Sequence, residues 1–253
     1  MRHQDATPGC DTLTHREPAM DTNELNQPIG KALPHWRACR VPSREPMQGR
    51  FCRLESVQVS AHAQDLSQTF ATDHSNWTYL PYGPFSSEAQ FAEWLEQNCL
   101  GDDPLFHTII DLQTSKPVGL ASYLRIEPAV GVIETGHIHY SPLMQRTPVA
   151  TETMYLMMHR VFEELGYRRY EWKCDALNEP SKRAARRLGF QYEGIFRQAT
   201  IYKGRNRDTA WFSILDSEWP VLKAAFEKWL QADNFDASGQ QRQSLGNLRS
   251  RVQ

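Results

Sequence analysis

The sequence predicts an α+β domain in which helices cover the faces of a sheet. Two observations support this class. Apolar segments of strand type interleave with segments whose apolar residues recur at helical spacing. Polar stretches without a sustained period flank this patterned region at both ends. We therefore expect a mobile N-terminal arm at 1–45, one folded domain at 46–231 and a polar, mobile C-terminal tail at 232–253.

The first expected elements are a strand and two helices. Residues 50–59 have a strand pattern, and Ser60 can cap the helix that follows. Ser86 or Ser87 can cap the second helix. The apolar residues at helical spacing are Leu66 and Phe70 in the first helix, and Phe91, Trp94 and Leu95 in the second.

Three strands and the clearest helix come next. Strands are expected at 105–112, 117–128 and 132–140, and the polar turn QTSK joins the first two. The helix after them ends near Gly166, which suits a C-terminal cap. Its apolar positions follow i, i+3, i+4, i+7, i+8 and i+11, and are Met154, Met157, Met158, Val161, Phe162 and Leu165.

The last expected elements complete the sheet and cover it. A strand at 167–174 precedes a short helix that Asn178 can begin and Gly189 can end. Strands at 195–203 and 207–215 follow. A final amphipathic helix places on one side Trp219, Leu222, Phe226 and Trp229.

The composition argues against several classes of function. A net charge of −2 over 253 residues gives no global attraction to nucleic acid or to an anionic membrane. No segment is long and apolar enough to cross a bilayer, and the N-terminal residues lack the apolar core of a secretion signal. The five scattered cysteines, without CxxC or HExxH, indicate free thiols and give no support for a metal site. We expect a cytoplasmic protein without membrane, nucleic-acid or metal partners; a homodimer stays open.

The stretch QRTPVA at 145–150 has the context of an anion site. It precedes a helix, whose start offers unpaired N–H groups and the positive end of the macrodipole. Pro148 has no N–H, yet proline favours the first helical position. Arg146 supplies a cation that can pair with a phosphate. An ordinary proline-initiated helix is the alternative.

The stretch NEPSKRAARRLGFQYEGIFRQATIYKGRNRDTAWFSIL resembles the C-terminal half of GNAT-type N-acetyltransferases. It is most similar to the branch that contains RimJ and RimL, the ribosomal-protein N-terminal acetyltransferases. The resemblance extends from about Gly49 to Trp219. Its marks, which are specific by their order and spacing, are Asn178, Ser181, Leu188-Gly189-Phe190, Glu193-Gly194, Arg197, Gly204, Asp208 and Ile214-Leu215.

The resemblance implies the GNAT fold, a splayed, mixed and mostly antiparallel sheet flanked by helices. It also implies acetyl-CoA as co-substrate, between the strand that ends near Tyr140 and the strand at 170–174. The family's pyrophosphate motif corresponds to 145–150, where Pro148 replaces one glycine and Arg146 stands where many members have another. The coenzyme-binding residues implied are Tyr140, Gln145, Arg146, Thr147, Val149, Ala150, Thr151, Asn178 and Ser181.

Acetyl transfer needs a proton donor for the departing thiolate and a route for the amine proton. The resemblance implies Ser181 as the donor, because Ala185 stands where many members carry a tyrosine. Thr200 stands where some members carry a carboxylate base and cannot serve. The remaining candidate bases lie on the strand before the anion site and are Glu134, His137 and His139.

Each catalytic candidate has a structural alternative. A period of two puts His137 and His139 on one face of the strand and Glu134 on the other, unless a bulge intervenes. A histidine titrates near neutrality and suits proton removal, but each of the three can equally be a strand residue satisfied by its neighbours. Catalysis by proximity, with water carrying the proton, is also open. Ser181 and Asn178 can both serve as helix caps.

Two further segments have a role implied by the family. NWTYLPYGPF at 76–85 borders the acceptor site there, so Trp77, Tyr79 and Tyr82 are candidate substrate-binding residues; packing of these rings on the core is the alternative. A basic zone can attract the 3′-phosphate of CoA or be a solvated helix face. It comprises Arg168-Arg169, Lys182-Arg183 and Arg186-Arg187.

The sequence thus predicts an acetyl-CoA-dependent N-acetyltransferase that acts on a primary amine by direct attack on the thioester. The acceptor is a protein N-terminus or a small-molecule amine. The alternative is a GNAT-fold module that binds CoA or a partner without catalysis. Pro148, Ala185 and Thr200 favour that alternative, because each departs from the family pattern.

Overall fold

The computed structural model describes residues 21–250, which fall into two units divided after Arg37. In the first unit, β1 (Asp21–Thr22) and β2 (Pro28–Ile29) form a short antiparallel hairpin. The second unit carries the predicted domain. Part of the predicted N-terminal arm, residues 1–20, lies outside the described residues.

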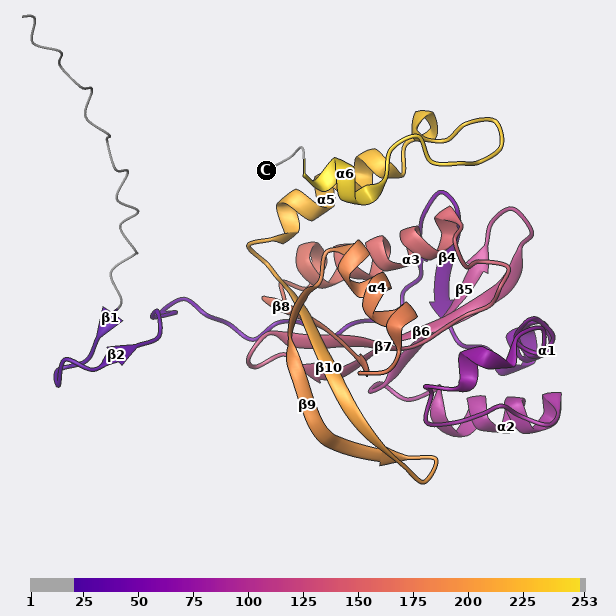
Figure 1. The fold of residues 1–253 in the computed structure, drawn as a ribbon, viewed down its shortest axis with the longest axis horizontal. Helices are drawn as coiled ribbons and strands as arrows, with labels where there is room; N and C mark the ends of the chain where they lie inside the picture. Colours follow the sequence, from indigo (N-terminus) through magenta and orange to yellow (C-terminus); the bar gives the residue numbers. More distant parts are fainter. Residues whose placement is uncertain (1–20, 251–253) are drawn as a thin grey trace, which may run out of the picture. The chain divides into compact units, whose positions relative to one another are not determined.

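The second unit is built on an eight-stranded sheet with the strand order β3-β4-β5-β6-β7-β8-β10-β9 (Figure 1). Neighbouring strands are antiparallel, except that β7 and β8 are parallel. This confirms the predicted mixed, mostly antiparallel sheet. The strands are β3 (Met47–Gln48), β4 (Cys52–Ser56), β5 (Leu105–Asp111), β6 (Lys116–Glu127), β7 (Val132–Tyr140), β8 (Arg169–Asp175), β9 (Gln191–Tyr202) and β10 (Arg205–Leu215).

Helices cover both faces of the sheet. Leu105 and Ala121 pack in the core cluster that contains α3 and α5, whereas their chain neighbours Phe106 and Leu120 pack with α1 and α2. Successive strand residues point to opposite faces, so the two clusters lie on opposite sides. The helices are α1 (Val59–Phe70), η1 (His74–Trp77), α2 (Glu88–Asn98), α3 (Pro148–His159), η2 (Arg160–Glu164), α4 (Glu179–Leu188), α5 (Trp219–Trp229), η3 (Ala232–Asn234) and α6 (Leu245–Arg249).

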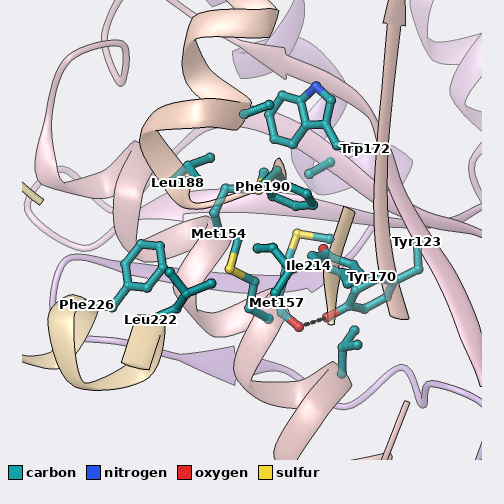
Figure 2. Packing of buried hydrophobic residues seen from close by; sticks show 14 of the residues in the cluster. Tyr123, Met154, Met157, Tyr170, Trp172, Leu188, Phe190, Ile214, Leu222 and Phe226 are labelled. Carbon is teal, nitrogen blue, oxygen red and sulfur yellow. Dashed lines mark hydrogen bonds between the residues drawn. The ribbon is translucent and has the colours of Figure 1, made fainter. Parts of the chain in front are cut away.

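The main core lies between α3 and the sheet, and Figure 2 shows part of it. Met154 and Met157 of α3 are fully buried, between Tyr170 of β8 and Phe226 of α5. The hydroxyl of Tyr123, on β6, donates to the main-chain carbonyl of Met157 at 2.8 Å. The helical period predicted for 154–165 therefore places the methionines inward, as expected.

The parallel strands β7 and β8 part midway. Their pairing runs from Val132 opposite Arg169 to Thr135 opposite Trp172 and then ends, although β7 continues to Tyr140. β8 also continues, to Asp175. Beyond Trp172 no strand pairing joins the two, which confirms the predicted splay.

The predicted helix caps are partly confirmed. Ser87 caps α2 and Asn178 caps α4, each by accepting a hydrogen bond from a backbone N–H of the first turn. Gly189 ends α4 in the left-handed conformation, with φ of 107°. The prediction for Ser60 is wrong, because α1 already begins at Val59 and no side chain caps it.

The C-terminal tail packs more closely than its polar composition predicts. Leu245 and Leu248 of α6 are buried against the core, and α6 lies beside α5 (Figure 1). The Asn234 side chain donates to the Trp229 carbonyl and accepts from the Gln243 N–H, each at 2.9 Å. The two leucines and these hydrogen bonds hold the tail on the domain.

The folded body also begins earlier than the predicted boundary at 46. The N–H of Cys39 donates to the Pro128 carbonyl at 3.0 Å. The Arg44 guanidinium forms an ion pair with Asp102 at 2.8 Å. These contacts place residues 38–45 on the domain, where a mobile arm or a loosely docked extension was expected.

Candidate functional site

Two cavities meet where β7 and β8 part. The first, called here the α3 cavity, has a volume of about 920 Å³ and lies at the N-terminus of α3, bordered by α4. The second, called here the β8 cavity, has a volume of about 790 Å³ and is lined by β6, β7, β8 and β10. The residues that line both cavities, and so mark their junction, are Asn76, Tyr79, Ile138, Trp172, Asn178 and Ser181.

The first turn of α3 leaves two backbone donors open. The Thr147 hydroxyl and N–H both donate to the Met144 carbonyl, at 2.7 and 3.2 Å, so this N-cap side chain does not cap the helix. Pro148 has no N–H. The N–H groups of Val149 and Ala150 therefore lack a side-chain cap, which leaves them available to an anion at the positive end of the helix.

This geometry corrects the predicted donor set. The N–H of Thr147, expected to face the ligand, is already hydrogen-bonded. Val149 is buried in the core and does not line the cavity with its side chain. The predicted coenzyme-binding residues of this segment that line the α3 cavity are Tyr140, Gln145, Arg146, Thr147, Ala150 and Thr151.

Arg146 adopts a backbone conformation that favours glycine. Its φ is 61°, in the left-handed region where an L side chain costs about 1 kcal/mol or more. This explains why a glycine is common at this place in the resembling family. The exposed guanidinium of Arg146 places a cation at the rim of the α3 cavity.

Only one residue of the predicted basic zone lines the α3 cavity. The Arg187 guanidinium donates to the Thr151 hydroxyl at 3.0 Å and lies 5.4 Å from the centroid of the Trp229 ring. Lys182 pairs instead with Glu179 at 2.5 Å. The Arg186 guanidinium lies over the Phe212 ring, away from the cavity. Arg187 is therefore the cation of α4 that can meet a bound phosphate.

Ser181 lies at the junction, in the first turn of α4. The indole N–H of Trp172 donates to the Ser181 hydroxyl oxygen at 3.0 Å. Because an indole N–H can only donate, the serine oxygen accepts in this bond and its own proton is directed elsewhere. Asn178 accepts from the Ser181 N–H at 3.1 Å, so its capping role is confirmed. Trp172, at which the pairing of β7 and β8 ends, thus orients the Ser181 hydroxyl, which is predicted to protonate the thiolate.

A bulge in β7 separates the two candidate histidines. Ser122 pairs with Gly136, but Leu120 pairs with His139, so β7 has one extra residue between these pairs. His137 has φ of 49° at this point. His137 lines the β8 cavity and lies 5.0 Å from the Phe106 ring, whereas His139 packs deeper in the same aromatic cluster of α1 and α2.

His139 does not fit the predicted role of base. It is buried, stacked on Phe70 at 3.8 Å between ring centroids and edge-on to Trp77 at 4.0 Å. Neither ring nitrogen has a hydrogen-bond partner among the described residues. Burial lowers the pKa of His139 to about 3, so the ring is neutral, and His139 lines neither cavity.

Glu134, a predicted catalytic candidate, lines the β8 cavity, and its carboxylate is ion-paired. Its carboxylate is 2.6 Å from Arg125 and 2.9 Å from the ammonium of Lys173. Lys173 also contacts Glu171 at 2.8 Å. The Glu134 carboxylate is thus held by two cations of the protein. The structure favours the alternative reading, a satisfied strand residue.

The predicted aromatic loop is split between core and site. Trp77 is buried in the cluster of α1 and α2, as in the alternative reading. Tyr79 lines both cavities, and its hydroxyl donates to the Leu177 carbonyl at 3.2 Å. The Tyr82 hydroxyl is 3.1 Å from Nδ1 of His137, so Tyr82 reaches the β8 cavity only through that ring.

Two residues that line these cavities were not singled out from the sequence. Asn76 donates to the Tyr140 carbonyl at 3.1 Å and accepts from Gln145 at 3.3 Å, which ties the loop to the cradle. Asp175, the last residue of β8, lines the β8 cavity beside the junction. The sequence signal for Asp175 was its position, as a polar residue at the carboxyl end of a splayed strand. Among residues 21–250 no group of His, Cys, Asp or Glu is placed to hold a metal, and no helix could cross a membrane.

The buried histidines predict a steep loss of stability in acid. Burial lowers the pKa of His107 and His139 to about 3 and that of His137 to about 4, against about 6.5 in an unfolded chain. The unfolded state therefore binds more protons below pH 6.5, and the stability present above that pH is lost as the pH falls toward 4. Replacing His139 with leucine should reduce the loss between pH 7 and pH 5 by about 2 kcal/mol. Urea unfolding of both proteins at the two pH values measures this, and an equal loss in both would contradict it.

Comparison with known proteins places the geometry in a family. A family model described as "Acetyltransferase (GNAT) domain" matches residues 53–191. A GCN5-related N-acetyltransferase from Brucella melitensis is 46% identical with a TM-score of 0.85, over 86% of this chain and 100% of that one. A probable GNAT-family acetyltransferase from Chromobacterium violaceum is 40% identical with a TM-score of 0.72, over 77% of this chain and 98% of that one.

One more distant structure was solved with ligands. It is the microcin self-immunity acetyltransferase MccE, in complex with acetyl-CoA and AMP. It is 20% identical, covers 66% of this chain and 93% of its own, and has a TM-score of 0.57, so it is similar in fold alone. No curated protein matches the chain.

Proposed function

This chain belongs to the GNAT acetyltransferase family, and from that membership we propose that it transfers the acetyl group of acetyl-CoA to a primary amine at the junction of the α3 and β8 cavities. Membership of this family supports the assignment of the chain as an N-acetyltransferase. The observation that carries the proposal is the parting of β7 and β8 after Trp172, with a helix N-terminus on one side and Ser181 between the two cavities.

The residues of the α3 cavity fit the anionic part of acetyl-CoA. The open N–H groups of Val149 and Ala150 would bind its pyrophosphate, as helix N-termini do. Arg146 and Arg187 add two cations on the same side. When bound, acetyl-CoA supplies an acetyl group activated as a thioester.

In the transfer, the bond that forms is matched by a bond that breaks, and the proton lost by one atom is matched by a proton gained by another. The amine nitrogen forms a bond to the acetyl carbon, the carbon–sulfur bond breaks, the nitrogen loses a proton and the sulfur takes one up. Ser181, oriented by Trp172, donates the hydrogen bond that the departing sulfur needs. We assign water in the β8 cavity as the acceptor of the amine proton, because Glu134 is ion-paired and His139 faces the core.

Three finer assignments belong to the same proposal. The RimJ/RimL-like branch is supported by Ser181 and Asn178, which both line the junction. A cytoplasmic location is supported by Cys52, Cys99 and Cys174, which are buried free thiols. The acceptor is a protein N-terminus or a small-molecule amine, and a homodimer is compatible with either.

Calorimetric titration with acetyl-CoA tests the cradle. We expect saturable binding that weakens about tenfold or more in Arg187→Ala and in Arg146→Ala, since a charge-assisted hydrogen bond contributes roughly 1.5–3 kcal/mol. Arg183→Ala is the matched control, because Arg183 is exposed on the same helix and lines neither cavity. Absence of binding at millimolar ligand, or equal weakening in the control, would refute the assignment.

A further inference from the structure

We infer that the acceptor is an amino acid, whose ammonium binds Asp175 and whose carboxylate binds Arg207 in the β8 cavity. This inference rests on the proposed function and narrows its acceptor from any primary amine to one that carries a carboxylate on the same small skeleton.

Asp175 is a buried carboxylate that forms no ion pair with a cation among the described residues. Its oxygens accept from the Leu177 N–H and from the Tyr202 hydroxyl, both at 2.8 Å, and both donors are neutral. No Lys, Arg or His of residues 21–250 lies within ion-pair distance. A buried charge without a counter-ion is costly, so a ligand ammonium in the cavity would be strongly favoured here.

The other buried carboxylates of the β8 cavity are different. Glu134 is paired with Arg125 and Lys173, and Glu171 with Lys173 and Arg169. Their charges are satisfied within the protein. Among the described residues, Asp175 is therefore the buried acid of this cavity that forms no ion pair within the protein, so its carboxylate can bind a charged substrate.

Arg207 is the complementary group. It lines the β8 cavity from β10, and its Nε donates to the Thr209 hydroxyl at 3.2 Å. No carboxylate of the described residues lies within ion-pair distance of it. A guanidinium with free donors matches the fork of a carboxylate.

Tyr202 relates the two charges. Its hydroxyl is bonded to Asp175, and the Arg207 guanidinium lies 5.8 Å from the centroid of its ring. The acid and the guanidinium thus both lie close to Tyr202 and line the same cavity. Asp175 is also next to the junction with Ser181, so the bound ammonium lies near the site of transfer, where it loses one proton to water before the neutral amine attacks the thioester.

The walls between the charges are partly apolar. Phe196 and Trp211 line the same cavity and stack on each other, with ring centroids 4.4 Å apart. An amino acid with an aromatic side chain has the matching carbon skeleton. Phenylalanine, phenylalaninamide and phenethylamine are therefore suitable probes, because they share the ring and the amine but differ in the carboxylate.

The test compares acetylation of the three probes by the full chain. Wild type should favour phenylalanine over the other two by about tenfold or more in kcat/KM. Arg207→Gln should remove this preference and leave kcat/KM for the amide within about twofold. Asp175→Asn should lower kcat/KM for all three. Arg205→Gln, on the exposed end of the same hairpin, should change none of them.

Direct binding separates recognition from turnover. Calorimetry of phenylalanine with the protein should show saturable binding that Arg207→Gln and Asp175→Asn both lose and Arg205→Gln keeps. Acetylation of the amide or of phenethylamine as fast as phenylalanine would overturn the inference and leave the proposed function intact. Acetylation of no amine at all would overturn both.

Discussion

Ser181→Ala should lower kcat by about 100-fold, the lower end of the range for a positioned proton donor. The Trp172 indole occupies the serine oxygen as an acceptor, so the hydroxyl proton is free to meet the departing sulfur. Binding of acetyl-CoA should change little, because the cradle at the start of α3 is separate. Steady-state kinetics with acetyl-CoA and an amine acceptor measures the effect.

Two further variants of this experiment make it specific. Ser181→Thr keeps a hydroxyl and should recover most of kcat. Ser60→Ala is the matched control, because Ser60 is exposed on α1 and lines neither cavity. If Ser181→Ala keeps the wild-type kcat, the serine is only a helix residue, and the departing sulfur is protonated by another route.

Glu152→Ala should lower the free energy of unfolding by roughly 3–5 kcal/mol. The buried Glu152 carboxylate, on α3, accepts from the N–H groups of Arg50, Phe51 and Cys52, at 2.8, 2.6 and 2.8 Å. It fixes the turn between β3 and β4 to the helix that carries the cradle. Gly49 is required there, because a Cβ at this position would collide with the carboxylate.

Urea unfolding of the variant at neutral pH tests this anchor. Glu96→Ala is the control, since Glu96 is exposed on α2 and substitutions of that kind change stability by about 0.5 kcal/mol or less. An unfolding midpoint of Glu152→Ala equal to that of the control would show that the three backbone groups find other partners.

Much of the fold could be predicted because it depends on local pattern. The apolar period of 154–165 buries Met154 and Met157, and Asn178 and Gly189 bound α4 as expected. The splay between β7 and β8 was implied by the family resemblance, and their pairing does end at Trp172. The helical features follow from periodicity and capping, which sequence spacing records.

The errors have a different origin. His139 was a candidate base because it lies on the strand before the anion site, but its ring is buried against Phe70 and Trp77. That burial depends on side chains from α1 and η1, which no single strand encodes. Thr147 lost its expected donor role because its hydroxyl and N–H turn back to Met144. The site role of Asp175 depends on which cations fold near it, a long-range property.

The most direct test of the account is to incubate the protein with acetyl-CoA and a panel of amines, and to follow acetylated amine by mass spectrometry and released CoA in parallel. We predict N-acetylated amine and free CoA in equal amounts, formed well above the uncatalysed rate. Saturable binding of acetyl-CoA with no acetylated amine from any acceptor would contradict the account and favour a GNAT-fold binding module without catalysis.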